Sequence, residues 1–286
     1  MQAYAIRALR WSIGSVVLLL LLFPALSQAQ TTFGTNPTTL LIPETYQGNE
    51  IQLKAWLQVP GGQGPFSTII LIPGCDGLDR NGWAQMQTWA RWLMQLDYAV
   101  MTIDSFTPRG VTNACANGEI IPGELHAADA YTAAAHLSHF RQLQGGKIGV
   151  IGFSHGGWGA LETASNRRPG IVELRARLAA QNVAIAAVVA VYPACFRHVQ
   201  ASFQIPLLIL IGEKDDWTPA GACRRLAAHA RLDGAPVELK VYPNAVHVFD
   251  IDKPPRTYIG HVLQYDAEAT ADARQQIQRF FAGFLH

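Results

Sequence analysis

The segment Gly152-Phe153-Ser154-His155-Gly156 has the spacing G-x-S-x-G and lies between a strand-like run and a helix-like run. Small residues on both sides of a serine let the chain reverse sharply, which exposes the hydroxyl beside a helix N-terminus. A serine hydroxyl is a weak nucleophile until a base takes its proton, and that base needs an acid to fix its tautomer. The segment therefore predicts nucleophilic catalysis by Ser154, with an ordinary glycine-rich turn as the alternative.

The candidate acid and base follow later in the chain, each just after a predicted strand. Asp215 lies in the segment 212–219 behind an apolar run, and His247 follows the predicted strand 237–242. The order serine, acid, histidine is the order found in α/β hydrolases. Spacing alone leaves Asp216 as an alternative acid. We expect His247 to be the base and Asp215 to orient it.

The other histidines are expected to lie outside this chemistry. His261 is a weak rival base, because it lies close to the terminal helix and no predicted strand precedes it. His126, His136 and His139 share one predicted helix, and we expect them on its solvated face.

Strand-like and helix-like segments alternate along the chain after residue 50. The predicted strands are 51–59, 67–72, 98–103, 147–153, 183–191, 206–211 and 237–242, and the predicted helices are 83–96, 124–143, 156–166, 171–180, 219–232 and 266–285. The runs 183–191 and 206–211 are almost wholly apolar, as parallel strands covered on both faces are. This alternation predicts one α/β domain over 30–286, a doubly wound, mostly parallel sheet with helices on both faces. Ligands bind at the carboxyl ends of such strands, where Ser154, Asp215 and His247 are expected.

Composition excludes several classes of protein. The chain has 286 residues, of which 49% are hydrophobic and 15% charged, with a formal net charge of +1. A chain this apolar buries a core rather than remaining disordered. A near-neutral balance supplies no basic surface for phosphate backbones, so we expect no nucleic-acid partner.

The first 29 residues have the layout of a secretory signal peptide. Arg7 and Arg10 precede the apolar run 13–23, and Ser27-Gln28-Ala29 offers small residues at the two cleavage positions. The run is short for a membrane span of about 20 residues. We expect cleavage after Ala29, export to the periplasm or the medium, and no stable membrane insertion afterwards. An uncleaved N-terminal anchor is the alternative.

Export implies that the four cysteines form disulfides, because an even number of cysteines in an oxidising compartment indicates pairing. Cys195 and Cys223 each follow a strand-like run, so we pair them, and we pair Cys75 with Cys115. Free buried cysteines are the alternative. No two cysteines have CxxC spacing and no HExxH segment is present, so we expect no metal site and no cofactor.

These segments together resemble the dienelactone hydrolase family of α/β hydrolases, in particular its exported relatives with a serine nucleophile. The resemblance extends from about residue 50 to 285, and the matching segments are PGCDG (73–77), DSFTPRG (104–110), GFSHGG (152–157), GEKDDWTP (212–219) and NAVHVF (244–249). The family pattern G-x-x-D-x-x-x-P implies Asp215 as the acid, since Gly212 precedes it by three residues and Pro219 follows it by four.

The resemblance also implies an oxyanion hole formed by the backbone N–H groups of Cys75 and His155, a kind of site in which each donor contributes about 3 kcal/mol. We add the hypothesis that a Cys75–Cys115 bridge braces the oxyanion loop. Two departures limit the resemblance. The namesake enzymes use a cysteine nucleophile where this chain has Ser154, and their oxyanion-loop glutamate corresponds to Gly74 here. Neither the thiol activation mechanism nor the dienelactone substrate is carried over.

Four further residues are candidates for substrate binding. The guanidinium of Arg109 suits a substrate carboxylate, although bracing its own loop explains the residue as well. Trp158, Trp217 and Phe249 flank the three catalytic candidates and are suited to line an apolar acyl pocket. Packing in the core is the alternative for each.

We therefore expect an exported serine carboxylesterase that cleaves small-molecule esters or lactones through an acyl-enzyme. An acyltransferase or a peptidase would use the same three residues, because nucleophile and oxyanion hole do not fix the leaving group. A protein of another class, which keeps the fold and binds a hydrophobic ligand without catalysis, is the further alternative.

Overall fold

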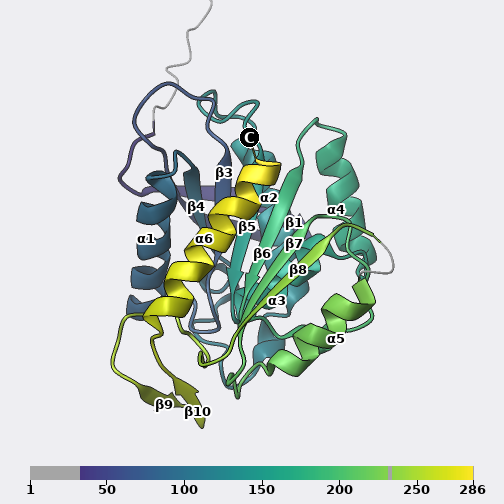
Figure 1. Cartoon of the computed structure of the whole chain (residues 1–286). Helices are drawn as coiled ribbons and strands as arrows, with labels where there is room; N and C mark the ends of the chain where they lie inside the picture. The colour runs from purple at the N-terminus through teal and green to yellow at the C-terminus, as the bar shows by residue number, and fades with distance from the viewer. Residues whose placement is uncertain (1–32, 231–233, 286) are drawn as a thin grey trace, which may run out of the picture. The chain divides into compact units, whose positions relative to one another are not determined.

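The computed structural model describes residues 33–230 and 234–285, so the predicted signal peptide 1–29 lies outside the described residues. An eight-stranded sheet runs through the centre (Figure 1). Its strands, in spatial order, are β1 (Thr38–Tyr46), β2 (Asn49–Gln58), β4 (Ala99–Asp104), β3 (Thr68–Ile72), β5 (Ile148–Phe153), β6 (Ile185–Val191), β7 (Leu207–Gly212) and β8 (Val237–Tyr242). The six strands from β4 to β8 are parallel, and β1 and β2 are antiparallel. The doubly wound, mostly parallel sheet predicted from the sequence is confirmed.

Helices cover both faces of this sheet. They are α1 (Arg80–Met94), α2 (Gly123–Leu137), α3 (His155–Ala164), α4 (Pro169–Ala179), α5 (Ala220–Ala230) and α6 (Ala267–Phe284). In Figure 1, α1 and α6 lie in front of the sheet and α2 and α3 lie behind it. Helix α4 packs on α2, and α5 packs against β7 and β8. Every residue of β3, β4, β5 and β7 is buried between these layers, which explains why their sequences are mostly apolar.

Two strand pairs extend beyond the predicted pattern. Strand β1 pairs with β2 at the edge of the sheet, where Pro43 is tolerated because an edge strand need not donate every backbone hydrogen bond. A short hairpin joins β9 (Arg256–Tyr258) and β10 (His261–Leu263) through a turn in which Ile259 and Gly260 both have positive φ. The hairpin is anchored next to β8, since Leu263 forms a bridge with His247.

Helix α2 is shorter than predicted. It ends at Leu137, and a series of turns continues to the start of β5, where the sequence pattern favoured helix to residue 143. No helix within the described residues is long and apolar enough to cross a bilayer.

The turn between β5 and α3 is the tightest reversal near the site. Ser154 has φ 52° and ψ −111°, an unfavourable conformation for a residue with a side chain. Its two flanking glycines are needed for space. A Cβ on Gly152 would lie 2.0 Å from the carbonyl oxygen of Gly156, and one on Gly156 would lie 2.3 Å from the carbonyl oxygen of Pro73. The turn is therefore held against the end of β3 by direct backbone packing.

We expect Gly156→Ala to lower the free energy of unfolding by about 1–3 kcal/mol, because the added methyl group overpacks backbone that cannot retreat. Urea unfolding followed by circular dichroism measures this change. Gly283→Ala in α6 is the control, since an added Cβ there meets no atom within 4 Å and helical alanine is more stable than glycine by about 0.5–1 kcal/mol. Equal unfolding midpoints for Gly156→Ala and the parent protein would contradict this account of the turn.

Candidate active site

Three loops at the carboxyl ends of neighbouring parallel strands bring Ser154, His247 and Asp215 together. Ser154 follows β5, Asp215 follows β7 and His247 follows β8. The Oγ of Ser154 lies 2.9 Å from Nε2 of His247, and Nδ1 of the same ring lies 2.8 Å from Oδ2 of Asp215. The three side chains form one hydrogen-bonded chain in which Nδ1–H donates to the carboxylate and Nε2 accepts from the hydroxyl.

The two alternatives that the sequence left open lie apart from this chain and beside each other. The carboxylate of Asp216 is exposed and lies 3.4 Å from Nδ1 of His261. It also accepts a hydrogen bond of 3.3 Å from the backbone N–H of Val262 in β10. Asp216 therefore holds the hairpin, and Asp215 is the carboxylate that meets His247.

The loop after β7 fixes the orientation of Asp215. Its Oδ1 accepts from the backbone N–H groups of Trp217 (3.0 Å) and Thr218 (2.8 Å), and its Oδ2 accepts from the Thr218 hydroxyl at 2.9 Å. These bonds leave Oδ2 directed at the imidazole of His247. Both side chains are almost fully buried, so the pair is shielded from water and its interaction is stronger than at a surface.

A second buried hydrogen-bond network lies against the imidazole of His247. The ring of Tyr192 packs edge-on against that of His247, with centroids 4.8 Å apart. The Tyr192 hydroxyl donates to Asp250 at 2.6 Å, and Gln85 and Trp89 donate to the other oxygen of this carboxylate at 2.8 and 2.7 Å. Burial, followed by the charge of Asp250, raises the pKa of Tyr192 well above its usual value. Sequence reasoning missed Tyr192 and Asp250, although the position of Tyr192 at the end of an apolar strand was a usable signal.

The loop after β3 lies alongside Ser154. A Cβ on Gly74 would be 3.7 Å from the Cβ of Ser154, so the neighbouring Cys75 is also at the nucleophile. His155 is the first residue of α3, and the first N–H groups of a helix have no partner within it. Cys75 is bonded to Cys115, and Cys195 is bonded to Cys223. Both predicted disulfides are thus present in the structure.

His126 and His155 form a buried pair beside the nucleophile. His126 is fully buried and its Nε2 lies 2.9 Å from Nδ1 of His155. Burial lowers the pKa of both imidazoles, so both rings are neutral at pH 7. The prediction that His126 lies on a solvated face is wrong, because α2 turns this position toward α3. Of its neighbours on the same helix, His136 is half-buried and His139 is exposed.

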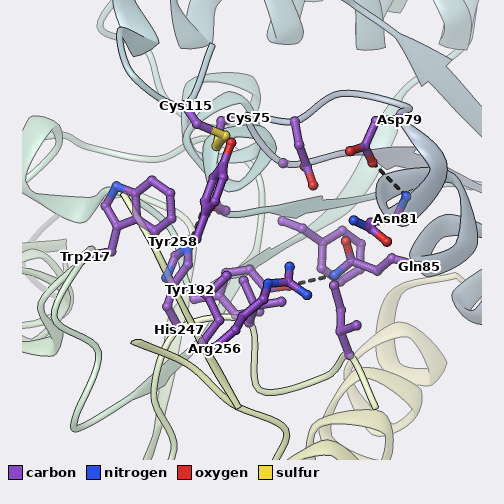
Figure 2. Close-up of a pocket in the computed structure, with 17 residues that line it drawn as sticks. Cys75, Asp79, Asn81, Gln85, Cys115, Tyr192, Trp217, His247, Arg256 and Tyr258 are labelled. Carbon is purple, nitrogen blue, oxygen red and sulfur yellow. Dashed lines mark hydrogen bonds between the residues drawn. A yellow bond between two sulfur atoms is a disulfide. The ribbon is translucent and has the colours of Figure 1, made fainter. Parts of the chain in front are cut away.

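Two adjoining hollows open beside Ser154, and both are lined by Cys75, Cys115 and Trp217. In the first hollow, Trp217 and Tyr258 lie on one side and Asn81 and Gln85 on the other, with Arg256 between them (Figure 2). The second hollow is lined additionally by His155, Trp158, Phe196 and Arg197. A reactive carbonyl at Ser154 would therefore have room for a substituent on either side.

Charged groups in the first hollow come from two segments. Arg256 belongs to β9, and Asp76 belongs to the loop after β3. Burial, and secondly the charge of Asp79, raise the pKa of Asp76 to about 6. The hollow thus contains a permanent cation and an acid that ionises near neutral pH. Sequence reasoning missed Arg256 and Tyr258, because the hairpin that carries them is too short and exposed to leave a periodic signal.

The four predicted substrate-binding residues separate into two groups. Trp217 lines both hollows and Trp158 lines the second, as expected for pocket residues. The expectation for Phe249 needs correction. This ring is fully buried in the core between Tyr192 and Tyr242, at centroid distances of 5.4 and 5.2 Å, so it cannot meet a substrate.

Arg109 braces its own loop, and its suggested contact with a substrate carboxylate also needs correction. Its guanidinium lies outside both hollows and donates to Asp129 at 2.7 and 3.0 Å, to Glu44 at 2.8 Å and to the carbonyl of Ser105 at 2.9 Å. Burial, and secondly the charge of Asp129, raise the pKa of Glu44 to about 9. At pH 7, Asp129 therefore balances the charge of Arg109, and Glu44 is protonated.

Within residues 33–230 and 234–285, no three His, Cys, Asp or Glu side chains lie close enough together to bind a metal ion. The arrangement of a serine and a buried histidine–carboxylate pair suits acyl transfer at Ser154.

Comparison with known proteins identifies a family and a fold to which the chain is similar. The family model described as "Dienelactone hydrolase family" matches residues 53–285. A protein of Methylorubrum extorquens named "Putative carboxymethylenebutenolidase" is 24% identical over 265 residues, which cover 88% of this chain and 84% of that protein. A dienelactone hydrolase from Anabaena variabilis is similar in structure, with a TM-score of 0.60, 18% identity, and coverage of 87% of this chain and 99% of that one. The esterase Pf2001 from Pyrococcus furiosus also has a TM-score of 0.60, with 17% identity and coverage of 88% and 94%.

The cluster around Arg109 makes a prediction about the pH dependence of stability. Above pH 4.5 the unfolded chain ionises Glu44 while the folded protein keeps it protonated up to about pH 9, so this group makes folding less favourable as pH rises between those values. We expect Glu44→Gln, which imitates the protonated acid, to gain stability relative to the parent protein from pH 5 to pH 9.

Asp129→Asn is the matched variant, because it removes the carboxylate that accepts two hydrogen bonds from the buried guanidinium of Arg109. We expect it to lose about 3 kcal/mol of stability at pH 7. Urea unfolding at pH 5, 7 and 9 measures both effects. If Glu44→Gln were destabilised increasingly toward pH 9, the assignment of the charge balance to Asp129 would be wrong.

Proposed function

Because the chain belongs to the dienelactone hydrolase family of α/β hydrolases and is a hydrolase of the ester or lactone type, we propose that it is an exported serine carboxylesterase acting on small esters or lactones. Ser154 is the nucleophile of this proposal, His247 the general base and Asp215 the orienting acid. The observation that carries it is the hydrogen-bonded chain from the Ser154 hydroxyl through His247 to Asp215, which opens into the two hollows.

The proposed reaction begins when Nε2 of His247 takes the Ser154 proton as Oγ attacks the carbonyl carbon. The backbone N–H groups of Cys75 and His155 stabilise the negative oxygen of the tetrahedral intermediate. The imidazolium, stabilised by Asp215, then returns the proton to the leaving alcohol, which departs and leaves the acyl group on Oγ. A water molecule, deprotonated in turn by His247, attacks the acyl-enzyme and releases the acid.

The walls of the two hollows support a substrate with an apolar part. Trp217 stands where the hollows meet, Tyr258 borders the first and Trp158 the second. Aromatic walls with a few polar groups are typical of sites for small molecules. We propose that the acyl and alcohol parts of the ester occupy opposite hollows, with the carbonyl at Ser154.

We also propose that the protein is exported. The predicted signal peptide over residues 1–29 supports it, as do the two disulfides, because such bonds persist in oxidising compartments.

Chemical labelling tests the nucleophile. We expect the parent protein to gain one adduct from a fluorophosphonate by intact mass, and Ser154→Ala to gain none and to lose hydrolysis of short p-nitrophenyl esters by at least about 10³-fold. Ser138→Ala is the control, since its hydroxyl bonds only to the backbone at the end of α2, and it should label like the parent. A folded parent protein that is neither labelled nor active would favour a non-catalytic binding protein. Transfer to an added alcohol or cleavage of peptides in preference to esters would favour the acyltransferase or the peptidase.

Asp215 and Asp216 are adjacent in the chain, so the same substitution at each tests which carboxylate orients His247. We expect Asp215→Asn to lower kcat by about 10³–10⁴-fold, because the amide cannot fix the imidazole in the productive tautomer. Asp216→Asn should lower kcat much less than Asp215→Asn does, as its exposed side chain bonds to the hairpin rather than to the imidazole of His247. Steady-state kinetics on one ester compares the two variants. A larger loss for Asp216→Asn than for Asp215→Asn would exchange their roles.

A further inference from the structure

We propose that the segment 113–120, which lies between β4 and α2, positions both halves of the oxyanion hole by binding the side chain of each donor residue. This inference rests on the proposed function, since it concerns the N–H groups of Cys75 and His155 as oxyanion donors. The two donors come from different parts of the chain, the loop after β3 and the first residue of α3. The turn before α3 packs directly on the end of β3, and the segment 113–120 adds a side-chain contact to each of the two donor residues.

The first tie is covalent. Cys115 is bonded to Cys75, and the N–H of the preceding Ala114 donates to the Cys75 carbonyl oxygen at 2.8 Å. The side chain of Asn113 in turn accepts from the N–H of Cys115 at 2.9 Å. The peptide groups on both sides of Ala114 are therefore fixed, and the disulfide of the adjoining Cys115 transmits their position to the loop after β3.

The second tie is a hydrogen bond to the side chain of the other donor residue. The carbonyl oxygen of Gly118 lies 2.9 Å from Nε2 of His155, and a carbonyl only accepts, so Nε2 carries the proton. Nδ1 of that neutral ring must then accept from Nε2–H of His126, at 2.9 Å. His126 thereby fixes the tautomer that bonds Gly118. The approach is close, since a Cβ on Gly118 would lie 3.2 Å from the His155 ring.

The segment is itself held by packing against the buried residues that flank it. Phe106, Ala114 and Ile121 form a small buried cluster, and the Phe106 ring lies 5.3 and 5.9 Å from the rings of His126 and His155. Earlier in the same loop, Arg109 binds Glu44 of β1 and Asp129 of α2 and so fixes the start of the loop. A firmly held segment that binds both donor residues is able to set their separation.

Two pairs of cysteines provide a matched test of the covalent tie. Serine replacements keep every backbone N–H, so Cys75→Ser with Cys115→Ser removes the bridge and leaves the donor in place. We expect kcat to fall at least about tenfold and KM to change less than about threefold, because complete removal of one such donor costs about 10²–10³-fold in kcat. Labelling of Ser154 by the fluorophosphonate should slow in proportion to kcat. Cys195→Ser with Cys223→Ser, at a bridge that joins neither donor, should keep kcat within about twofold.

The ratio of ester to thionoester hydrolysis gives a readout that general loosening of the fold does not move. An oxyanion hole distinguishes the two substrates by its fit to oxygen rather than sulfur, so a loosened hole lowers the ratio. We expect the ratio to fall in the Cys75/Cys115 variant and to stay unchanged in the Cys195/Cys223 variant. Circular dichroism and thermal unfolding establish that each variant is folded at the assay temperature.

A second pair of variants tests the hydrogen bond independently. His155→Ala removes the donor to Gly118, whereas His155→Gln keeps an N–H group at comparable reach. We expect the alanine variant to lose kcat and substrate discrimination as the cysteine variant does, and the glutamine variant to recover most of both. The inference would be overturned if the cysteine and His155 variants are folded and keep the parental kcat and ester-to-thionoester ratio. In that case, labelling of Ser154 by the fluorophosphonate would still support the proposed function. A parent protein in which Ser154 is neither labelled nor needed for turnover would overturn both.

Discussion

The close packing of backbone around Ser154 is the constraint on which the rest of the site depends. The chain turns there from a fully buried strand into α3, and the carbonyl oxygens at the end of β3 leave no space for a side chain on Gly156. One contact thus decides three things at once. It directs the hydroxyl out of the sheet, brings the N-terminus of α3 to the nucleophile, and holds the loop after β3 beside both. The strain at φ 52° is offset by burial of the elements on either side.

The electrostatic arrangement follows from where the parallel strands end. Loops from β7 and β8 reach the same edge as Ser154, so an acid and a base 32 residues apart meet with almost no exposure. Backbone N–H groups of its own loop orient Asp215, and rings of Tyr192 and Trp217 hold the imidazole of His247. The buried pair is stable in this setting because its hydrogen bonds are satisfied. The sheet therefore determines where the three side chains lie, and the loops provide the hydrogen-bonding groups around them.

The least regular parts of the chain form the walls of the site. The hairpin of β9 and β10 brings Arg256 and Tyr258 to the first hollow, and it is held there by the stacking of His261 on Trp217 at 4.6 Å. The long loop before α2 borders both hollows through Cys115. Part of the wall of each hollow thus comes from segments outside the central sheet, which is the usual place for binding residues on a rigid scaffold.

Local patterns in the sequence determined the features that depend on near neighbours. The apolar runs predicted buried parallel strands, G-x-S-x-G predicted the turn at Ser154, and the positions after the strands placed Asp215 and His247 on one edge of the sheet. The pairing of Cys195 with Cys223 followed from the same reasoning. Contacts between distant segments were decided only by tertiary structure: the burial of His126 against α3, the partners of Arg109 on β1 and α2, the place of Phe249 in the core, and the hairpin over the hollow. Periodicity fixes which face of an element is apolar, whereas the side chain that meets a given residue across the fold depends on how the layers pack, and that information is spread over the whole chain.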